Sequence, residues 1–423
     1  MSDILEFYQE QAKAGLSTIP WLALLQKNAL NEFNRYAFPT RKDEDWKYTA
    51  MDGFLQHRFA KFSEEAASDV AKINADIPIG RQLVIHNGQV VDVEKFTDKF
   101  PAGVIVKPLL QAMEEHADKI KPYLDKLLKH EHGFHALNMA ALQTGVLIYV
   151  PKGVLIEEPI VLAHWQDKAN QAVHSRHLII AEEGSQATII ETFHGMDACN
   201  YLTNTVTEVQ VGKNAKIIHY KIQCESHAAF HIGHLTVQQE SESQFDSHSL
   251  SLGGKLVRSD LTFNLQELRA QCLMNGIYIP TDQQHVDHHT TVHHLVPDCS
   301  STQDYKGILT GKSRAVFNGK VVVAKDAQHT RAAQQNKNLI LSALAEIDTK
   351  PQLEIFADDV LCSHGATVGQ LDEDALFYMA TRGIDREDAS CYLIHAFAAD
   401  NLRLVPHPEM VNWMSNLITR QLR

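Results

Sequence analysis

The sequence has no long apolar run, no dense basic segment and no closely spaced cysteine pair. No stretch reaches the roughly 18 apolar residues that a membrane helix needs. Residues 1–15 lack the basic start and apolar stretch of a signal peptide. A net charge of -13 disfavours nucleic-acid binding, which depends on Lys and Arg that neutralise phosphates. The sequence therefore predicts a cytoplasmic protein that binds neither membrane nor nucleic acid.

The cysteines are scattered, and none forms a C-x-x-C pair, which disfavours a zinc ribbon. In a reducing compartment, scattered cysteines are mostly buried thiols. A phosphate loop is also missing from KGILTGKS (306–313). Gly307 and Gly311 enclose three residues where the motif requires four, and a strand-like segment follows where the motif requires a helix. We interpret this segment as a turn between strands.

The first third of the chain is predicted to be mostly helical, as a domain spanning residues 1–142. Apolar residues recur three and four positions apart in residues 1–60 and again in 106–142. Between them, RQLVIHNGQVVDV (81–93) has two β-rich runs around Asn87-Gly88, which predicts a hairpin with a type I′ turn.

The pattern then changes to short strands of period two, which we assign to a β-domain over 143–367. GSQATII at Gly184, GKNAKII at Gly212 and a looser copy at Gly311 repeat a glycine turn followed by a strand. Such units favour a stacked β-solenoid, in which each coil buries its inward residues on its neighbours. The pattern alone leaves an antiparallel sandwich or barrel open. Residues 368–423 return to helix, with Asp385 placed as an N-cap.

A histidine-rich segment, HVDHHTTVHH (285–294), is a candidate metal site. On a strand, residues of equal parity share a face. His285, His289 and His293 would then lie together, with His288 and His294 on the opposite face. Imidazoles bind zinc, iron or copper. Without a defined carboxylate partner, we favour a solvated polar outer face over a metal site.

Cys362 and His364 in DDVLCSHGATVG (358–369) are the second candidate. If this segment is extended, both side chains point to the same side. An imidazole near a thiol favours the thiolate, and the two groups could together bind iron or zinc. An inert buried cysteine is the alternative, which the small and polar neighbours make less attractive.

Three segments resemble the SufB/SufD family of iron–sulfur cluster assembly proteins. They are PTRKDEDWKYT (39–49), FNGKVVVAKDAQHTRAAQQNKNLILS (317–342) and NLILSALAEIDTKPQLEIFADDVLCSHGATVGQLDEDALFYMATRGI (338–384). The resemblance covers nearly the whole chain. Within the family the chain is more similar to SufD-type than to SufB-type members. SufB-type chains carry a glutamate at the position of Gly365 and a cysteine at the position matching Asn336.

The resemblance implies a right-handed parallel β-helix between N-terminal and C-terminal helical domains. It implies a non-catalytic scaffold subunit that helps to build a nascent cluster and supports iron acquisition. The partners would be SufB, bound through the β-helix end, and two copies of the SufC ATPase, bound through residues 368–423. His364 would handle the cluster or iron, with Cys362 as a second ligand or sulfur acceptor. No tightly bound cofactor is expected in the isolated chain.

Alternatives remain at this point. A metal-dependent β-fold enzyme would use His285 and His289, whereas a purely structural partner would have an inert Cys362–His364 pair. An isolated chain could also self-pair through the surface meant for SufB. Tyr378, Tyr392 and Phe397 could belong to the ATPase-binding face or to the core of the C-terminal helices, and we expect core for most of them.

Overall fold

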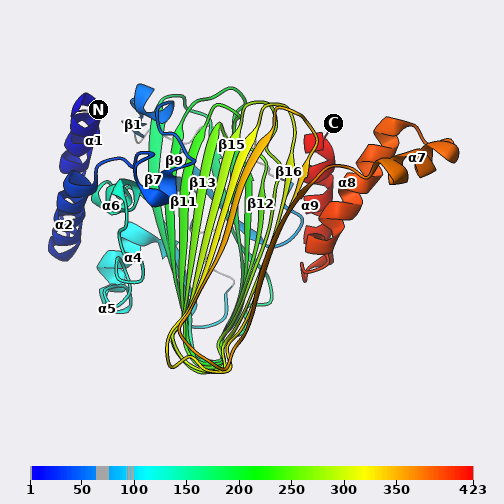
Figure 1. The fold of residues 1–423 in the computed structure, drawn as a ribbon. Helices are drawn as coiled ribbons and strands as arrows, with labels where there is room; N and C mark the ends of the chain where they lie inside the picture. Colours follow the sequence, from blue (N-terminus) through cyan, green and yellow to red (C-terminus); the bar gives the residue numbers. More distant parts are fainter. Residues whose placement is uncertain (1, 63–75, 92, 94–95, 97–99, 423) are drawn as a thin grey trace.

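The structure, a computed structural model, describes residues 2–62, 76–91, 93, 96 and 100–422. Two long parallel sheets face each other along the molecule, with the N-terminal helices on one side and the C-terminal helices on the other (Figure 1). From β5 onward the chain alternates between the two sheets, so that odd-numbered strands build the first sheet and even-numbered strands build the second.

The first sheet has the order β19-β17-β15-β13-β11-β9-β7-β5-β4, with β1 paired to β7. Its strands are β1 (Ala60–Lys61), β4 (Ile105–Pro108), β5 (Val146–Val150), β7 (Gln171–Ala181), β9 (Leu202–Val211), β11 (Phe230–Gln239), β13 (Leu256–Leu265), β15 (His285–His294), β17 (Arg314–Val323) and β19 (Glu346–Ile355). Apart from the β4–β5 pair, its strands are parallel.

The second sheet has the order β20-β18-β16-β14-β12-β10-β8-β6-β2-β3. Its strands are β2 (Arg81–His86), β3 (Gln89–Val91), β6 (Ile160–Gln166), β8 (Gln186–Gly195), β10 (Lys216–Cys224), β12 (Gln244–Ser251), β14 (Gln271–Tyr278), β16 (Ser300–Leu309), β18 (Arg331–Ile340) and β20 (Leu361–Gly369).

The register of the strands shows a stacked solenoid. Lys216 pairs with Gln186 on one side and with Gln244 on the other, so one coil takes 216 − 186 = 30 residues and the next 244 − 216 = 28. The repeats at Gly184 and Gly212 precede β8 and β10, which are neighbours in one sheet, whereas the looser copy at Gly311 precedes β17 in the other. The β-solenoid prediction is confirmed, and the parallel pairing excludes the antiparallel sandwich or barrel.

The space between the sheets holds the main apolar core. Alternate residues of each strand point into it, such as Ile189 on β8, Ile217 on β10 and Phe263 on β13. The other residues of the same strands face outward, where helices cover many of them. Burial on both faces explains the long apolar runs in β5 and β6, which lack a clean alternation.

The N-terminal helices cover the outer face of the first sheet. They are α1 (Ser2–Ala14), α2 (Pro20–Tyr36), α4 (Leu109–Glu115), α5 (Ala117–Ile120) and α6 (Gly133–Ala140), with short 3-10 turns at Glu44–Trp46 and Phe54–Gln56. Phe33 and Phe134 pack in one cluster with Leu178 and Phe230 of the sheet. The helical prediction is confirmed for much of residues 2–36, whereas 37–60 holds only the two 3-10 turns before β1. The second segment, 106–142, differs at its start, where Val106 belongs to β4 and pairs with β5.

The hairpin prediction is confirmed within the described residues. β2 and β3 pair antiparallel, and Asn87 and Gly88 both have the positive φ of a type I′ turn, 46° and 86°. The hairpin is not separate from the β-domain, because β2 also pairs with β6 and so extends the second sheet.

The C-terminal helices are α7 (Glu373–Thr381), α8 (Arg386–Leu402) and α9 (Pro408–Leu422). The predicted N-cap is confirmed, because the Asp385 side chain accepts a hydrogen bond from the Asp388 backbone N–H at 2.9 Å. α8 and α9 cover the outer face of the second sheet through residues such as Ile394 and Met414, whereas α7 projects away from the sheets (Figure 1). Across the described residues, no helix is long and apolar enough to span a membrane.

Candidate functional site

The solenoid is open at the end formed by β19 and β20. β19 pairs only with β17 and β20 only with β18, so each strand leaves one edge of its backbone without a neighbouring strand among the described residues. Apolar side chains are exposed here, with Leu361 70% and Phe356 64% accessible. An uncovered strand edge is a template for pairing with another chain, and an exposed apolar patch marks an interaction site.

Cys362 and His364 both lie on β20, as their spacing predicted. Cys362 is half-buried and packs against the small interior cluster of Val321, Val323 and Ala332. His364 has the same parity on the strand and is paired in register with Gln334, which is itself buried. The two residues therefore lie on the interior side of the last coil. His364 is nevertheless exposed, because no further coil covers it.

The predicted activation of the thiol is not found in the isolated chain. Burial raises the pKa of the Cys362 thiol, and a hydrogen bond with the Ala332 backbone offsets this only in part. His364 is not among the groups that shift it. The thiol is thus the favoured form here. A thiolate would have to be produced by a ligand or by a change of surroundings at this end.

The interior beside His364 is lined by amides. The Gln334 side-chain amide donates to Gln303 Oε1 at 2.9 Å, and Gln303 accepts a second hydrogen bond from the Thr290 hydroxyl at 2.8 Å. Asn336 is fully buried, and its side-chain amide donates a hydrogen bond to the Tyr278 hydroxyl oxygen at 3.1 Å. The soft donors of the open end are therefore Cys362 and His364 alone among the described residues of β18, β19 and β20.

The histidine-rich segment forms β15, and its parity prediction is confirmed. His288 and His294 face the interior, where they contact the Ser251 hydroxyl at 3.2 Å and the Ser301 hydroxyl at 2.8 Å. These two rings are 1% and 0% exposed. The predicted outer face, with His285, His289 and His293, is half-buried rather than fully solvated.

His285 and His289 lie on the outer face of β15, under the N-terminal segment. His285 contacts the Thr49 hydroxyl at 3.0 Å, and His289 lies 3.0 Å from Asp287 Oδ1 and 3.0 Å from Arg258 Nη1. The carboxylate partner is Asp287, which stands within the histidine-rich segment itself. Its other oxygen accepts a hydrogen bond from the Arg258 guanidinium at 2.6 Å. These histidines belong to a buried network that holds the 39–49 motif on the sheet.

The aromatic residues of the C-terminal helices differ in exposure. Tyr378 on α7 and Tyr392 on α8 are 60% and 58% exposed, so the expectation that most of the set is core is wrong for these two. The reason is that α7 leaves the sheet, and α8 buries the face that carries Ile394 and Ala398 instead. Phe397 is half-buried against the second sheet, with the Lys306 ammonium 4.8 Å from its ring centre.

Sequence reasoning did not single out His132 and His135, which gather with Asp260 within 4.8 Å of one another. The spacing H-x-x-H at the start of a helix is the signal that could have found the two histidines, because it places both rings on one side. Asp260 comes from β13, and no local pattern connects it to them.

Comparison with known proteins agrees with this architecture. The model of the SUF system FeS cluster assembly SufBD core domain matches residues 164–397, and that of the SufBD protein N-terminal region matches residues 2–162. The iron–sulfur cluster assembly protein SufD of Escherichia coli is 33% identical over 380 residues, 88% of this chain and 86% of its own length. Protein ABCI7, chloroplastic, of Arabidopsis thaliana is 32% identical over 88% of this chain and 80% of its own.

The SufB protein of Bacillus subtilis is 26% identical over 88% of this chain and 79% of its own length. The similarity therefore extends to both branches of one family and runs through the helical regions as well as the solenoid. The chain belongs to the SufB/SufD family of iron–sulfur cluster assembly proteins.

Proposed function

We propose that this chain is a SufD-like, non-catalytic scaffold subunit that pairs through its open end with a SufB-type chain. The single observation that carries the proposal is the uncovered edge of β19 and β20, on which Cys362 and His364 are presented. A related solenoid with the same coil dimensions can continue both sheets across this edge by backbone hydrogen bonding. The nascent iron–sulfur cluster, as the cargo of the complex, would then form at the junction.

Cys362 and His364 supply the donor types that suit this cargo. Thiolate and imidazole are ligands of iron in clusters, and a metal or cluster displaces the thiol proton on binding. The raised pKa of Cys362 keeps the thiol protonated until then. His364 is the primary ligand in this proposal because it is the exposed member of the pair, and Cys362 is a second ligand or sulfur acceptor.

The C-terminal helices are proposed to bind a SufC-type ATPase, which would supply the ATP hydrolysis of the complex. α7 projects from the body, and its exposed face carries Phe377 and Tyr378, 71% and 60% accessible. Exposed aromatics on a protruding helix are typical of a partner site. This role, the support of iron acquisition and the cytoplasmic location are proposals that rest on the family resemblance.

The test is co-expression with SufB-type and SufC-type partners, purification through a tag on this chain, and anaerobic iron and sulfide analysis. We expect the wild-type complex to carry a cluster and the His364→Ala complex to lose most of it. Ser363→Ala is the matched control, because Ser363 is an exposed neighbour on the same strand with the opposite parity. Equal cluster content in the wild-type and His364→Ala complexes would overturn the role of His364.

Self-pairing of the isolated chain follows from the same edge. Light scattering of the purified chain, with and without a SufB-type partner, measures it directly. We expect the isolated chain to form a homodimer that the partner converts to a heterodimer. A monomer at all concentrations would remove self-pairing from the proposal without affecting the heterodimer.

A further inference from the structure

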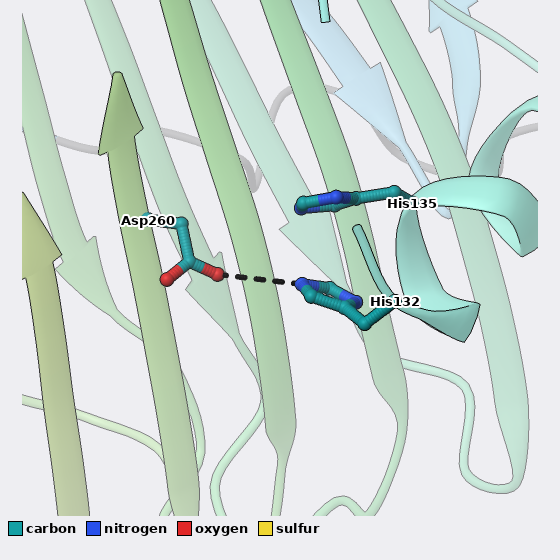
Figure 2. Close-up of side chains that lie close together, drawn as sticks. All are labelled: His132, His135 and Asp260. Atoms are coloured by element: carbon teal, nitrogen blue, oxygen red, sulfur yellow. Dashed lines mark ion pairs between the residues drawn. The ribbon is translucent and has the colours of Figure 1, made fainter. Parts of the chain in front are cut away.

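A second group of metal-binding side chains lies far from β20, at the junction between the N-terminal helices and the first sheet. His132 directly precedes α6, His135 lies in the first turn of α6, and Asp260 projects from the outer face of β13 (Figure 2). One ligand atom from each residue lies within 4.8 Å of the other two. All three side chains are buried or nearly so.

These polar atoms lack adequate partners in the protein. His132 Nε2 is 3.6 Å from Asp260 Oδ2, which is longer than a hydrogen bond, and the rings of His132 and His135 are only 3.6 Å apart between centres. In the part of the chain that the structure describes, both ring nitrogens of His132, Nε2 of His135 and Oδ2 of Asp260 have no hydrogen-bond partner. Buried polar groups are normally satisfied, so this concentration of unsatisfied atoms requires an explanation.

The charge balance points to a cation. Arg258 is the buried cation of the group, and it contacts two buried carboxylates, Asp260 at 2.8 Å and Asp287 at 2.6 Å. Two buried carboxylates therefore share one guanidinium beside the two imidazoles.

An adjoining cavity would admit the ion. It has a volume of about 600 Å³ and is lined by His132, His135 and Asp260, and also by the exposed Glu44, so it reaches the surface. Its basic lining residues are Arg258, Lys320 and Lys350. Its acidic lining residues are twice as many, namely Asp43, Glu44, Asp45, Glu131, Asp260 and Glu354. An acidic cleft raises the local concentration of cations.

We propose that His132, His135 and Asp260 bind one divalent transition-metal ion of the Fe²⁺ or Zn²⁺ class. Two imidazoles and one carboxylate, with further positions open to water in the cavity, form a ligand set that such ions prefer and that Mg²⁺ does not. Ligand atoms around one such ion at about 2.0–2.2 Å are roughly 3–3.5 Å apart. The observed separations require only small movements of the side chains.

Metal binding makes one specific demand on His135. Its Nδ1 now accepts a long hydrogen bond of 3.3 Å from the Glu131 backbone N–H, which leaves the proton on Nε2. Coordination through Nε2 requires the other tautomer and therefore the loss of this contact. His234 could serve as an additional ligand. Its ring centre is 4.5 Å from that of His135, and both of its nitrogens lack hydrogen-bond partners among the described residues.

The ion would connect the start of α6 to β13. The 39–49 motif also contacts both of these parts. Trp46 of the 39–49 motif packs edge-on against His132, with ring centres 5.1 Å apart, and the Arg258 guanidinium lies 4.5 Å above its ring. A metal at this point ties the start of α6 to β13. It should therefore stabilise the docking of the N-terminal region on the solenoid, independently of the cluster role proposed for His364.

The experiment uses the full chain without an affinity tag, freed of metal with a chelator and kept anaerobic. Fe²⁺, Zn²⁺ and Mg²⁺ are added separately, and the metal that remains after gel filtration is measured. We expect about one Fe²⁺ or Zn²⁺ per chain, no retained Mg²⁺, and a rise in Tm of a few degrees. X-ray absorption of the loaded wild-type chain should show nitrogen and oxygen neighbours at about 2.0–2.2 Å and no sulfur.

Variants then assign the site. His135→Gln should weaken binding by at least about tenfold, whereas His364→Ala should leave the stoichiometry unchanged, so failure here is distinguishable from failure of the cluster proposal. Because His135→Gln could disturb folding, the absorption spectrum of the wild-type chain provides the independent test. No retained ion, a sulfur neighbour, or loss of the ion in His364→Ala would each overturn the proposal.

Discussion

Beneath the N-terminal helices Arg176 lies fully buried between Glu208 and Asp125, whereas at the open end of the solenoid His364 lies exposed on a strand with one neighbour. Around Arg176, both neighbouring carboxylates are paired within the chain. Glu208 accepts hydrogen bonds from the Arg176 side chain and from three backbone N–H groups of residues 125–128. At the open end, β19 and β20 each lack a neighbouring strand on one side among the described residues. The difference teaches that the paired charges around Arg176 serve stability, while the backbone groups of the uncovered edge are available to a second chain.

The largest effect should come from breaking the closed junction. Arg176→Leu removes the partner of Glu208, which is fully buried, and leaves an uncompensated charge there. We expect a loss of about 3–5 kcal/mol in the free energy of unfolding, measured in urea. Arg386→Ala is the control, because Arg386 pairs with Glu373 on the surface, where both side chains are 70% exposed. The control should show no measurable change. Equal behaviour of the two variants would contradict the comparison.

The junction should also make the protein sensitive to acid. Burial, with a smaller contribution from the nearby Lys61, lowers the pKa of His174 from its usual 6.5 to about 3. The unfolded chain takes up this proton near pH 6.5, while the folded chain does not until about pH 3. Stability is therefore lost as the pH falls through this window, by about 1.4 kcal/mol per pH unit for this one group.

His174→Asn tests this sign directly. Urea unfolding between about pH 4 and 5.5 should show a dependence on pH that is smaller by close to one proton than in the wild type. His288, with a pKa of about 3, is buried like His174 and should leave part of the dependence in place. If the unfolding free energy of His174→Asn depends on pH as strongly as that of the wild type, the fold does not hold this ring neutral.

The smallest effect on stability should come from the exposed aromatics of the C-terminal helices. Tyr378→Ala and Tyr392→Ala remove side chains that are 60% and 58% exposed, so Tm should stay unchanged. Binding of the SufC-type partner, measured by calorimetry, should weaken by at least about tenfold for Tyr378→Ala. Tyr48→Ala, at an exposed tyrosine of the N-terminal region, is the matched control. Unchanged binding in both C-terminal variants would place the ATPase elsewhere.

Deletion of residues 368–423 would not test whether the C-terminal helices bind the SufC-type ATPase. Met410, Met414 and Ile418 of α9 cover the outer face of the second sheet, together with Ile394 of α8. Their removal would expose apolar residues of several strands, and loss of binding could then follow from unfolding alone. Surface substitutions on α7 avoid this ambiguity because α7 projects from the body (Figure 1).

Much of the fold is readable from local patterns in the sequence. The order of helix, β-solenoid and helix, the hairpin at Asn87-Gly88 and the N-cap at Asp385 all depend on neighbouring residues, and all were predicted. The two faces of β15 were also predicted, because strand parity is local. Which face of β15 lies in the interior and which lies under the N-terminal segment was not predicted, because this depends on how the coils stack.

The parts that could not be predicted depend on contacts between distant residues. Asp260 meets His132 across 260 − 132 = 128 residues, and Arg258 meets Asp287 on the next coil. The raised pKa of Cys362 follows from its packing against Val321 and Val323, which no spacing around Cys362 reveals. The exposure of Tyr378 depends on the direction in which α7 leaves the sheet.

The central claim is that the β19–β20 edge is the partner surface, and amide hydrogen exchange tests it most directly. In a parallel strand, alternate backbone groups bond to each neighbour, so about half of the amides of an edge strand remain free. The reference is the isolated chain, diluted until light scattering shows a monomer. We predict that residues 346–355 and 361–369 exchange quickly there and become protected on binding a SufB-type partner. If these two segments exchange at the same rate in the complex while other surfaces become protected, the open end is not the interface.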